Sequence, residues 1–285
     1  MLGRLAAILL LAYLGFADVK ALSRARDLYR RTAYEQALKA LEEASQTDAS
    51  VYALAGKCRF HLEDFKRAVE ALEEAVAAEP GNSGYYDWLG KAWGRRAENS
   101  SFLTAPRYAT RARDAFQKAV ELDPRNLEAV SDLFEYYLEA PGFLGGGKDK
   151  AAQLSETIKE VDRAEYHYLQ ARLAEKREDV AAAEEHYRAA AKLAPEQAGR
   201  LLDLAGFLSR QERYQESEAV FREAENMTPN DPKALFARAS AYVRAGRKLA
   251  EARRLLGRYI ESDLTPEHPS RNEARRLLEK AEKSR

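Results

Sequence analysis

The sequence predicts an all-α protein built from repeated helix pairs, because similar text and the same landmarks recur at a fixed spacing. Pro195 and Pro229 lie 34 residues apart, as do Gly56 and Gly90. The recurring stretches are FKRAVEALEEAVAAEPGN, ARDAFQKAVELDPRN, AAAEEHYRAAAKLAPEQ and ESEAVFREAENMTPND. Each has the apolar periodicity of an amphipathic helix and a proline that ends it. One helix pair cannot bury both of its apolar faces, so such repeats must stack into a solenoid.

We expect seven helix-turn-helix repeats followed by a capping helix. The repeats span roughly 18–48, 49–82, 83–126, 127–163, 164–197, 198–231 and 232–266, and the cap spans 270–283. Ala112 and Ala183 occupy positions at which a small side chain lets two helices approach closely. Phe116 and Tyr187, four residues later, are expected to fill the groove one turn further on.

The third and fourth repeats are longer than the others. The third carries a ten-residue insertion around AENSSFLTAP, and the fourth has PGFLGGGKDKA between its two helices. We expect two enlarged turns at the same edge of the solenoid. The glycines of the second turn suggest an adjustable backbone.

The third repeat also resembles the tetratricopeptide repeat family. Its first half contains Trp88 (or Tyr86), Leu89, Gly90 and Trp93, and its second half contains Ala112, Phe116, Ala119 and Pro124. The resemblance covers essentially the whole chain after residue 17, and it implies a right-handed superhelical solenoid. The Pro-Gly and Gly-Gly turns are similar to those of exported bacterial repeat proteins. Because these repeats serve many unrelated binding tasks, the resemblance names no partner.

The first residues have the pattern of a secretory signal peptide. Arg4 precedes an uncharged run from Leu5 to Ala17, and that run ends in Gly15-Phe16-Ala17. Its 13 residues are fewer than the roughly 20 that span a bilayer. We therefore expect residues 1–17 to be removed near Ala17, with Ala21 as an alternative cleavage point, and the mature chain to be extracytoplasmic and periplasmic. An uncleaved anchor is the alternative, and it would be the chain's membrane contact.

Charge and cysteine content exclude several classes of function. The chain has 46 Lys and Arg and 46 Asp and Glu residues, so no overall positive field attracts nucleic acid. Basic clusters near Arg24 and Arg254 are interpreted as solvated helix faces. Cys58 is the only cysteine, which excludes an internal disulfide, and we expect it to be buried inside a helix pair.

One stretch imitates a phosphate-binding loop. Gly142, Gly147 and Lys148 fit the spacing G-x-x-x-x-G-K, but Asp149 stands where a serine or threonine should bind magnesium. The preceding residues, NLEAVSDLFEYYLEA, have helical periodicity, whereas a phosphate loop follows a strand. We interpret the stretch as a turn in which glycines adopt positive φ and Asp149 complements a helix dipole. No nucleotide is expected.

No pattern in the sequence indicates catalysis or a metal. The four histidines, at positions 61, 167, 186 and 268, lack metal-ligand spacing, and no Gly-x-Ser-x-Gly motif is present. We therefore predict a protein that is not an enzyme and that uses no cofactor.

The function predicted is a scaffold of the cell envelope that binds a protein or an extended peptide. The alternative is an accessory or regulatory subunit of an envelope enzyme or assembly complex. In the family that the chain resembles, a concave groove would present Lys57, His61, Lys91, Arg95, Glu135 and Glu139.

A second candidate surface is the edge formed by the two enlarged turns, which carry Phe102, Leu103, Phe143, Leu144 and Lys148. Apolar side chains of this kind are unusual in solvated turns and indicate a binding edge. Alternatively, the two turns pack on each other and cover the second helix of the fourth repeat, whose sequence matches the pattern poorly.

Overall fold

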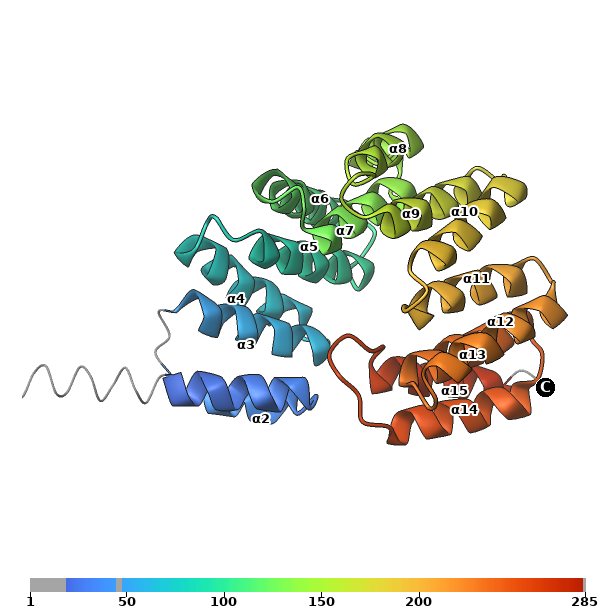
Figure 1. Ribbon diagram of the computed structural model, residues 1–285. Helices are drawn as coiled ribbons and strands as arrows, with labels where there is room; N and C mark the ends of the chain where they lie inside the picture. The colour runs from blue at the N-terminus through green and yellow to red at the C-terminus, as the bar shows by residue number, and fades with distance from the viewer. Residues whose placement is uncertain (1–18, 45–47, 284–285) are drawn as a thin grey trace, which may run out of the picture. The chain divides into compact units, whose positions relative to one another are not determined.

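The computed structural model describes residues 19–44 and 48–283, and its regular elements there are all helical (Figure 1). The all-α fold predicted from the sequence is thereby confirmed. The predicted signal segment, 1–17, lies outside the described residues. The chain divides into two compact parts, residues 1–147 and 148–285, called here the N-terminal and C-terminal units.

The N-terminal unit begins with helical residues 19–30. It continues with α2 (Tyr34–Leu41), α3 (Ala49–His61), α4 (Phe65–Ala78), α5 (Ser83–Glu98), α6 (Ala105–Leu122), α7 (Leu127–Glu139) and the short 3-10 helix η1 (Gly142–Leu144). Helices α3, α4 and α5 lie side by side in chain order (Figure 1). Successive helices therefore pack on one another as stacked repeats do.

The C-terminal unit contains α8 (Lys148–Glu156), α9 (Arg163–Lys176), α10 (Val180–Leu193), α11 (Ala198–Arg210), α12 (Tyr214–Met227), α13 (Pro232–Ala245), α14 (Leu249–Glu261) and α15 (Arg271–Lys283). Its helix pairs α9 with α10, α11 with α12 and α13 with α14 contact one another, and α15 packs on α14 (Figure 1). Helix α8 is short because residues 157–161 already form turns.

Polar side chains fix where many of the helices begin. Asn82 and Asn126 accept hydrogen bonds at the starts of α5 and α7, from the backbone of Tyr85 and Ala129 at 3.2 Å in each case. The Asn126 amide also donates to the Ser83 hydroxyl at 2.8 Å, which joins the beginnings of these two helices. Such caps satisfy backbone N–H groups that have no partner inside the helix.

Small residues lie where the helices of a pair cross. Ala112 and Ala183 are buried, as the repeat pattern predicted. At Gly90, an added Cβ would lie 2.5 Å from the ring of Phe116. The backbone of α5 can therefore approach α6 only because this position carries no side chain.

The insertion in the third repeat differs in form from the enlarged turn that we expected. Helix α5 runs to Glu98 and α6 begins at Ala105, so only residues 99–104 are non-helical. Most of the added sequence lengthens the two helices. Stacking of the Arg96 guanidinium over Tyr108, 4.5 Å from the ring centre, packs the two extensions together.

Candidate partner-binding surface

Three of the predicted groove residues, Lys57, His61 and Lys91, lie around the ring of Trp88. The ammonium groups of Lys57 on α3 and Lys91 on α5 each lie 4.9 Å from the centre of the Trp88 ring. Burial lowers the pKa of Lys57. His61 stacks on Tyr34 with 4.6 Å between ring centres. The structure thus brings Lys57, His61 and Lys91 together around aromatic rings that the sequence alone had not placed in the site.

Lys91 is also the centre of an ion-pair network between α5 and α7. Its ammonium contacts the carboxylates of Asp87 at 2.9 Å, Asp132 at 3.0 Å and Glu128. Burial raises the pKa of Asp87 to about 7, and burial also raises the pKa of Asp132. Burial alone would lower the pKa of Lys91. The charges of the three carboxylates outweigh burial, so the pKa of Lys91 is raised.

The carboxylates of Asp87, Glu128 and Asp132 lie close enough together to surround a metal ion. However, the Lys91 ammonium already pairs with all three acids and supplies the compensating charge. We interpret the cluster as a structural ion network that joins α5 to α7. Lys91 therefore pairs with acids of this chain and is not a free cation for a partner.

The other predicted groove residues lie apart from Trp88. Arg95 pairs with Glu98 at 2.6 Å and lies over the Phe65 ring. Glu135 is partly buried and Glu139 is exposed, both on α7. Two of the predicted groove cations, Lys91 and Arg95, are therefore paired with acids of this chain.

The two predicted loops expose large apolar side chains. The exposed fractions are 83% for Phe102, 76% for Leu103 and 81% for Phe143. Leu144 is only partly exposed, and Lys148 begins α8 in the C-terminal unit. Because the two phenylalanines are exposed, the alternative in which the loops bury each other's apolar side chains does not describe them.

The loop from Ala140 to Gly147 is held in place by hydrogen bonds to neighbouring helices. The carbonyl oxygen of Leu144 accepts from Arg113 of α6 at 3.2 Å and from the Tyr136 hydroxyl at 2.9 Å. The backbone N–H of Gly147 donates to the Tyr137 carbonyl at 2.7 Å. Three hydrogen bonds therefore anchor a backbone whose glycines had suggested an adjustable conformation.

The glycines of this loop serve close packing and turning. Gly145 has φ +88°, and an added Cβ at Gly146 would lie 1.8 Å from the Ala140 carbonyl oxygen. The helix α7 precedes the loop and Asp149 lies in the first turn of α8, as the sequence had predicted. A phosphate-binding loop would instead follow a strand.

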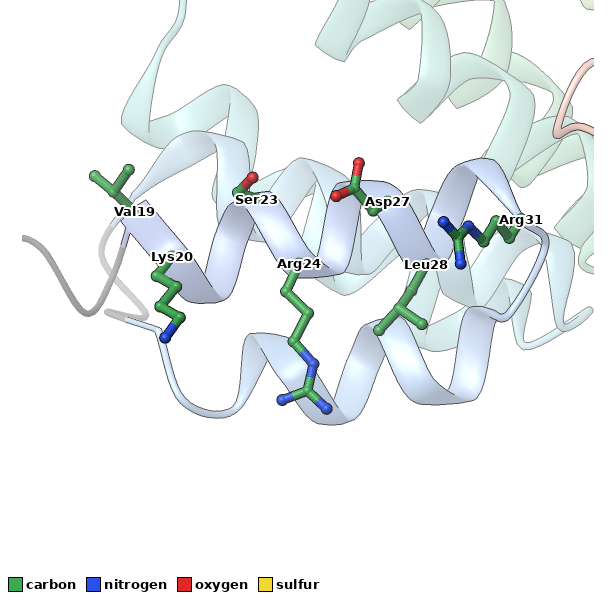
Figure 2. Close-up of a pocket in the computed structure, with 7 residues that line it drawn as sticks. All are labelled: Val19, Lys20, Ser23, Arg24, Asp27, Leu28 and Arg31. Carbon is green, nitrogen blue, oxygen red and sulfur yellow. The ribbon is translucent and has the colours of Figure 1, made fainter.

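A shallow hollow of about 550 Å³ lies along the N-terminal helix. Figure 2 shows Lys20, Arg24 and Leu28 directed to the same side of that helix, as their four-residue spacing requires. Asp27 offsets part of the charge by pairing with Arg30 at 2.8 Å. Its lining begins at Val19, the first described residue, and we assign the hollow no role.

Within the described residues, no helix is both long enough and apolar enough to cross a membrane.

The chain belongs to the tetratricopeptide repeat family. The family's sequence model matches residues 22–83, 168–234 and 202–269, which together make up more than half of the chain. No curated protein matches the sequence.

Two solved structures show the same fold. One is a thermophilic tetratricopeptide repeat protein from Thermus thermophilus, with 21% identity, 67% of this chain and 99% of that chain covered, and a TM-score of 0.55. The other is a tetratricopeptide repeat protein from Parabacteroides merdae, with 12% identity, 93% and 99% covered, and a TM-score of 0.61. At these identities the likeness concerns the fold alone.

Proposed function

We propose that this protein is a non-enzymatic scaffold of the cell envelope that binds a partner protein at the edge formed by residues 99–104 and 140–147. The tetratricopeptide repeat fold supports a protein-interaction role and is generally non-catalytic. The observation that carries the proposal is the exposure of Phe102, Leu103 and Phe143. Exposed apolar side chains on turns with a hydrogen-bonded backbone are typical of interaction surfaces.

The construction of the edge favours binding. Phe143 sits on a turn whose backbone is hydrogen-bonded to α6 and α7, so little of its main chain must become ordered when a partner arrives. An aromatic side chain on an ordered main chain costs less conformational entropy on binding than one on a mobile loop. Trp88 and the residues around it, Lys57, His61 and Lys91, form a second contact surface in the same proposal.

Photo-crosslinking in the native cell tests the proposal. A photoreactive phenylalanine analogue replaces Leu103 in one variant and exposed Glu74 on α4 in the matched control. We expect a discrete adduct from position 103 and none from position 74. Equal labelling at both positions, or none at position 103, would count against an edge-binding scaffold.

The envelope assignment rests on the pattern of residues 1–17 and is tested separately. We expect the intact mass of the exported protein to show the loss of about twenty residues. A full-length species extracted only with detergent would overturn cleavage and support an anchor instead.

A further inference from the structure

The C-terminal unit contains a cleft at the turn between α11 and α12 that reaches the end of α13. Two hollows of about 180 and 280 Å³ form it, and they share the lining residues Ser209, Tyr214, Ala241 and Ala245. None of these residues belongs to the edge loops of the N-terminal unit. The cleft therefore shares no residue with the surface proposed above.

The smaller hollow has an apolar floor. Phe221, Ala241 and Tyr242 line it and are exposed by only 1%, 6% and 7%. Its volume is below the roughly 300–1,000 Å³ of pockets that enclose small-molecule ligands. A hollow of this size and lining suits one apolar side chain projecting from a longer segment.

Two arginines without an acidic partner lie at the cleft, one in each hollow. Arg244 lines the larger hollow and Arg247 the smaller one, and both are exposed. Among the residues that the structure describes, neither guanidinium has a carboxylate partner. Their neighbours differ: Arg210 binds both carboxylate oxygens of Glu175 at 2.9 Å, and Lys248 pairs with Glu218 at 2.8 Å.

Arg247 is also held in position. Its guanidinium carbon lies 3.9 Å from the centre of the Tyr214 ring. Stacking uses the face of a guanidinium and leaves the N–H donors at its edge available for a carboxylate. Two acids line the cleft, Glu212 in the larger hollow and Glu218 in the smaller one. Glu218 already pairs with Arg238 and Lys248, so among the described residues the two unpaired guanidiniums face one unpaired carboxylate, that of Glu212.

We propose that this cleft binds an extended acidic segment of a partner protein, with one apolar side chain in the smaller hollow and carboxylates at Arg244 and Arg247. The combination of an apolar floor and unpaired guanidiniums favours an acidic peptide over a polyanion such as RNA. RNA bases are bound mainly by stacking on open aromatic faces, and here Arg247 already covers the ring of Tyr214. Arg244 and Arg247 line different hollows, so they suit two separate side-chain carboxylates better than the single carboxylate of a chain end. The proposed segment is therefore internal to the partner's chain.

Fluorescence anisotropy with defined peptides tests the proposal. The probe is a labelled octapeptide with one phenylalanine among aspartates and an amidated C-terminus. Two control peptides replace the phenylalanine by serine or the aspartates by asparagines. We expect the probe to bind at least about tenfold more tightly than either control, and more weakly as the salt concentration rises.

Two variants of the full chain locate the site. The double variant Arg244→Gln/Arg247→Gln should weaken the probe at least about tenfold, and Ala245→Leu should do the same by filling the hollow. The matched control, Lys192→Gln/Lys233→Gln, also removes two exposed charges from the C-terminal unit, and it should bind normally. Phe102→Ser/Phe143→Ser should leave probe binding unchanged, which separates this site from the edge loops.

Several results would overturn the proposal. They are the absence of probe binding, equal binding of the serine control, and equal weakening by the lysine control variant. Tighter binding of an RNA oligonucleotide than of the probe would assign the arginines to a polyanion instead. A requirement for a free C-terminal carboxylate would show that a chain end, rather than an internal segment, is recognised.

Discussion

The guanidinium of Arg113 on α6 donates a hydrogen bond of 3.2 Å to the carbonyl oxygen of Leu144, in the loop that follows α7. This bond ties the loop of the fourth repeat to the second helix of the third. Tyr136 donates to the same oxygen at 2.9 Å, so the turn is fixed from two sides. The exposed Phe143 is therefore displayed on a turn that is hydrogen-bonded to α6 and α7.

Replacing Gly146 by alanine should disturb that support. The added Cβ would lie 1.8 Å from the Ala140 carbonyl oxygen, so the backbone of the loop must shift. We expect a loss of about 1–3 kcal/mol in the free energy of unfolding, measured by chemical denaturation. Gly142→Ala is the matched control, because a Cβ added there would have nothing within 4 Å and no loss is expected. Equal stability of the two variants would show that the loop is not closely packed.

Replacing Ala183 by leucine should open the crossing of α9 and α10. Ala183 is fully buried and packs in the cluster that contains Tyr187 and Phe207. Overpacking at such a position should cost roughly 1–3 kcal/mol of stability in denaturant titration. Ala181→Leu, on the exposed face of the same helix, should have little effect. If both substitutions were harmless, the assigned helix crossing would be incorrect.

The buried acid Asp87 should make stability depend on pH. Burial raises its pKa in the folded protein to about 7 from the ordinary 3.8, so the folded state holds a proton that the unfolded state has released. The contribution of this group is complete below about pH 4 and is lost as the pH rises to about 7. Asp87→Asn should remove that part of the pH dependence while Lys91 keeps Asp132. Denaturation at several pH values checks this, and an unchanged slope in the variant would contradict it.

The single thiol should report opening of the N-terminal unit. Cys58 is 0% exposed, and burial raises the pKa of its thiol to about 12. In native buffer we therefore expect almost no reaction with a thiol reagent, because the reactive species is the thiolate. The rate should rise with denaturant as the surrounding helices open. Rapid native labelling followed by mass spectrometry would show that the helix pair is not closed.

The fold was predictable because its signals are local. Alanines, aromatic residues and prolines recur within each repeat, and buried Ala112, Ala183 and Phe116 confirm the pattern. Turn details were less accessible. Glu63 and Glu178 adopt φ of +62° in equivalent turns, where a glycine would have been the expected signal.

The candidate site was only partly predictable, because its electrostatics depend on neighbours far along the chain. Lys91 was expected to face a groove, but its partner Asp132 belongs to the next repeat. The four-residue spacing of Asp87 and Lys91 was an available signal for part of this network. Conversely, the sequence placed Phe102 and Phe143 in the two turns but left open whether they are exposed or packed on each other, and in the structure both are exposed.

The most direct test of the central claim is partner capture by the Phe102→Ser/Phe143→Ser variant, measured together with its melting temperature. The crosslinking experiment first identifies the adduct that serves as the partner, and binding of that protein to wild type and variant is then compared. Since both side chains are exposed, the account predicts loss of capture with little change in melting temperature. Retained capture with a large fall in melting temperature would contradict it, because the two phenylalanines would then serve the fold.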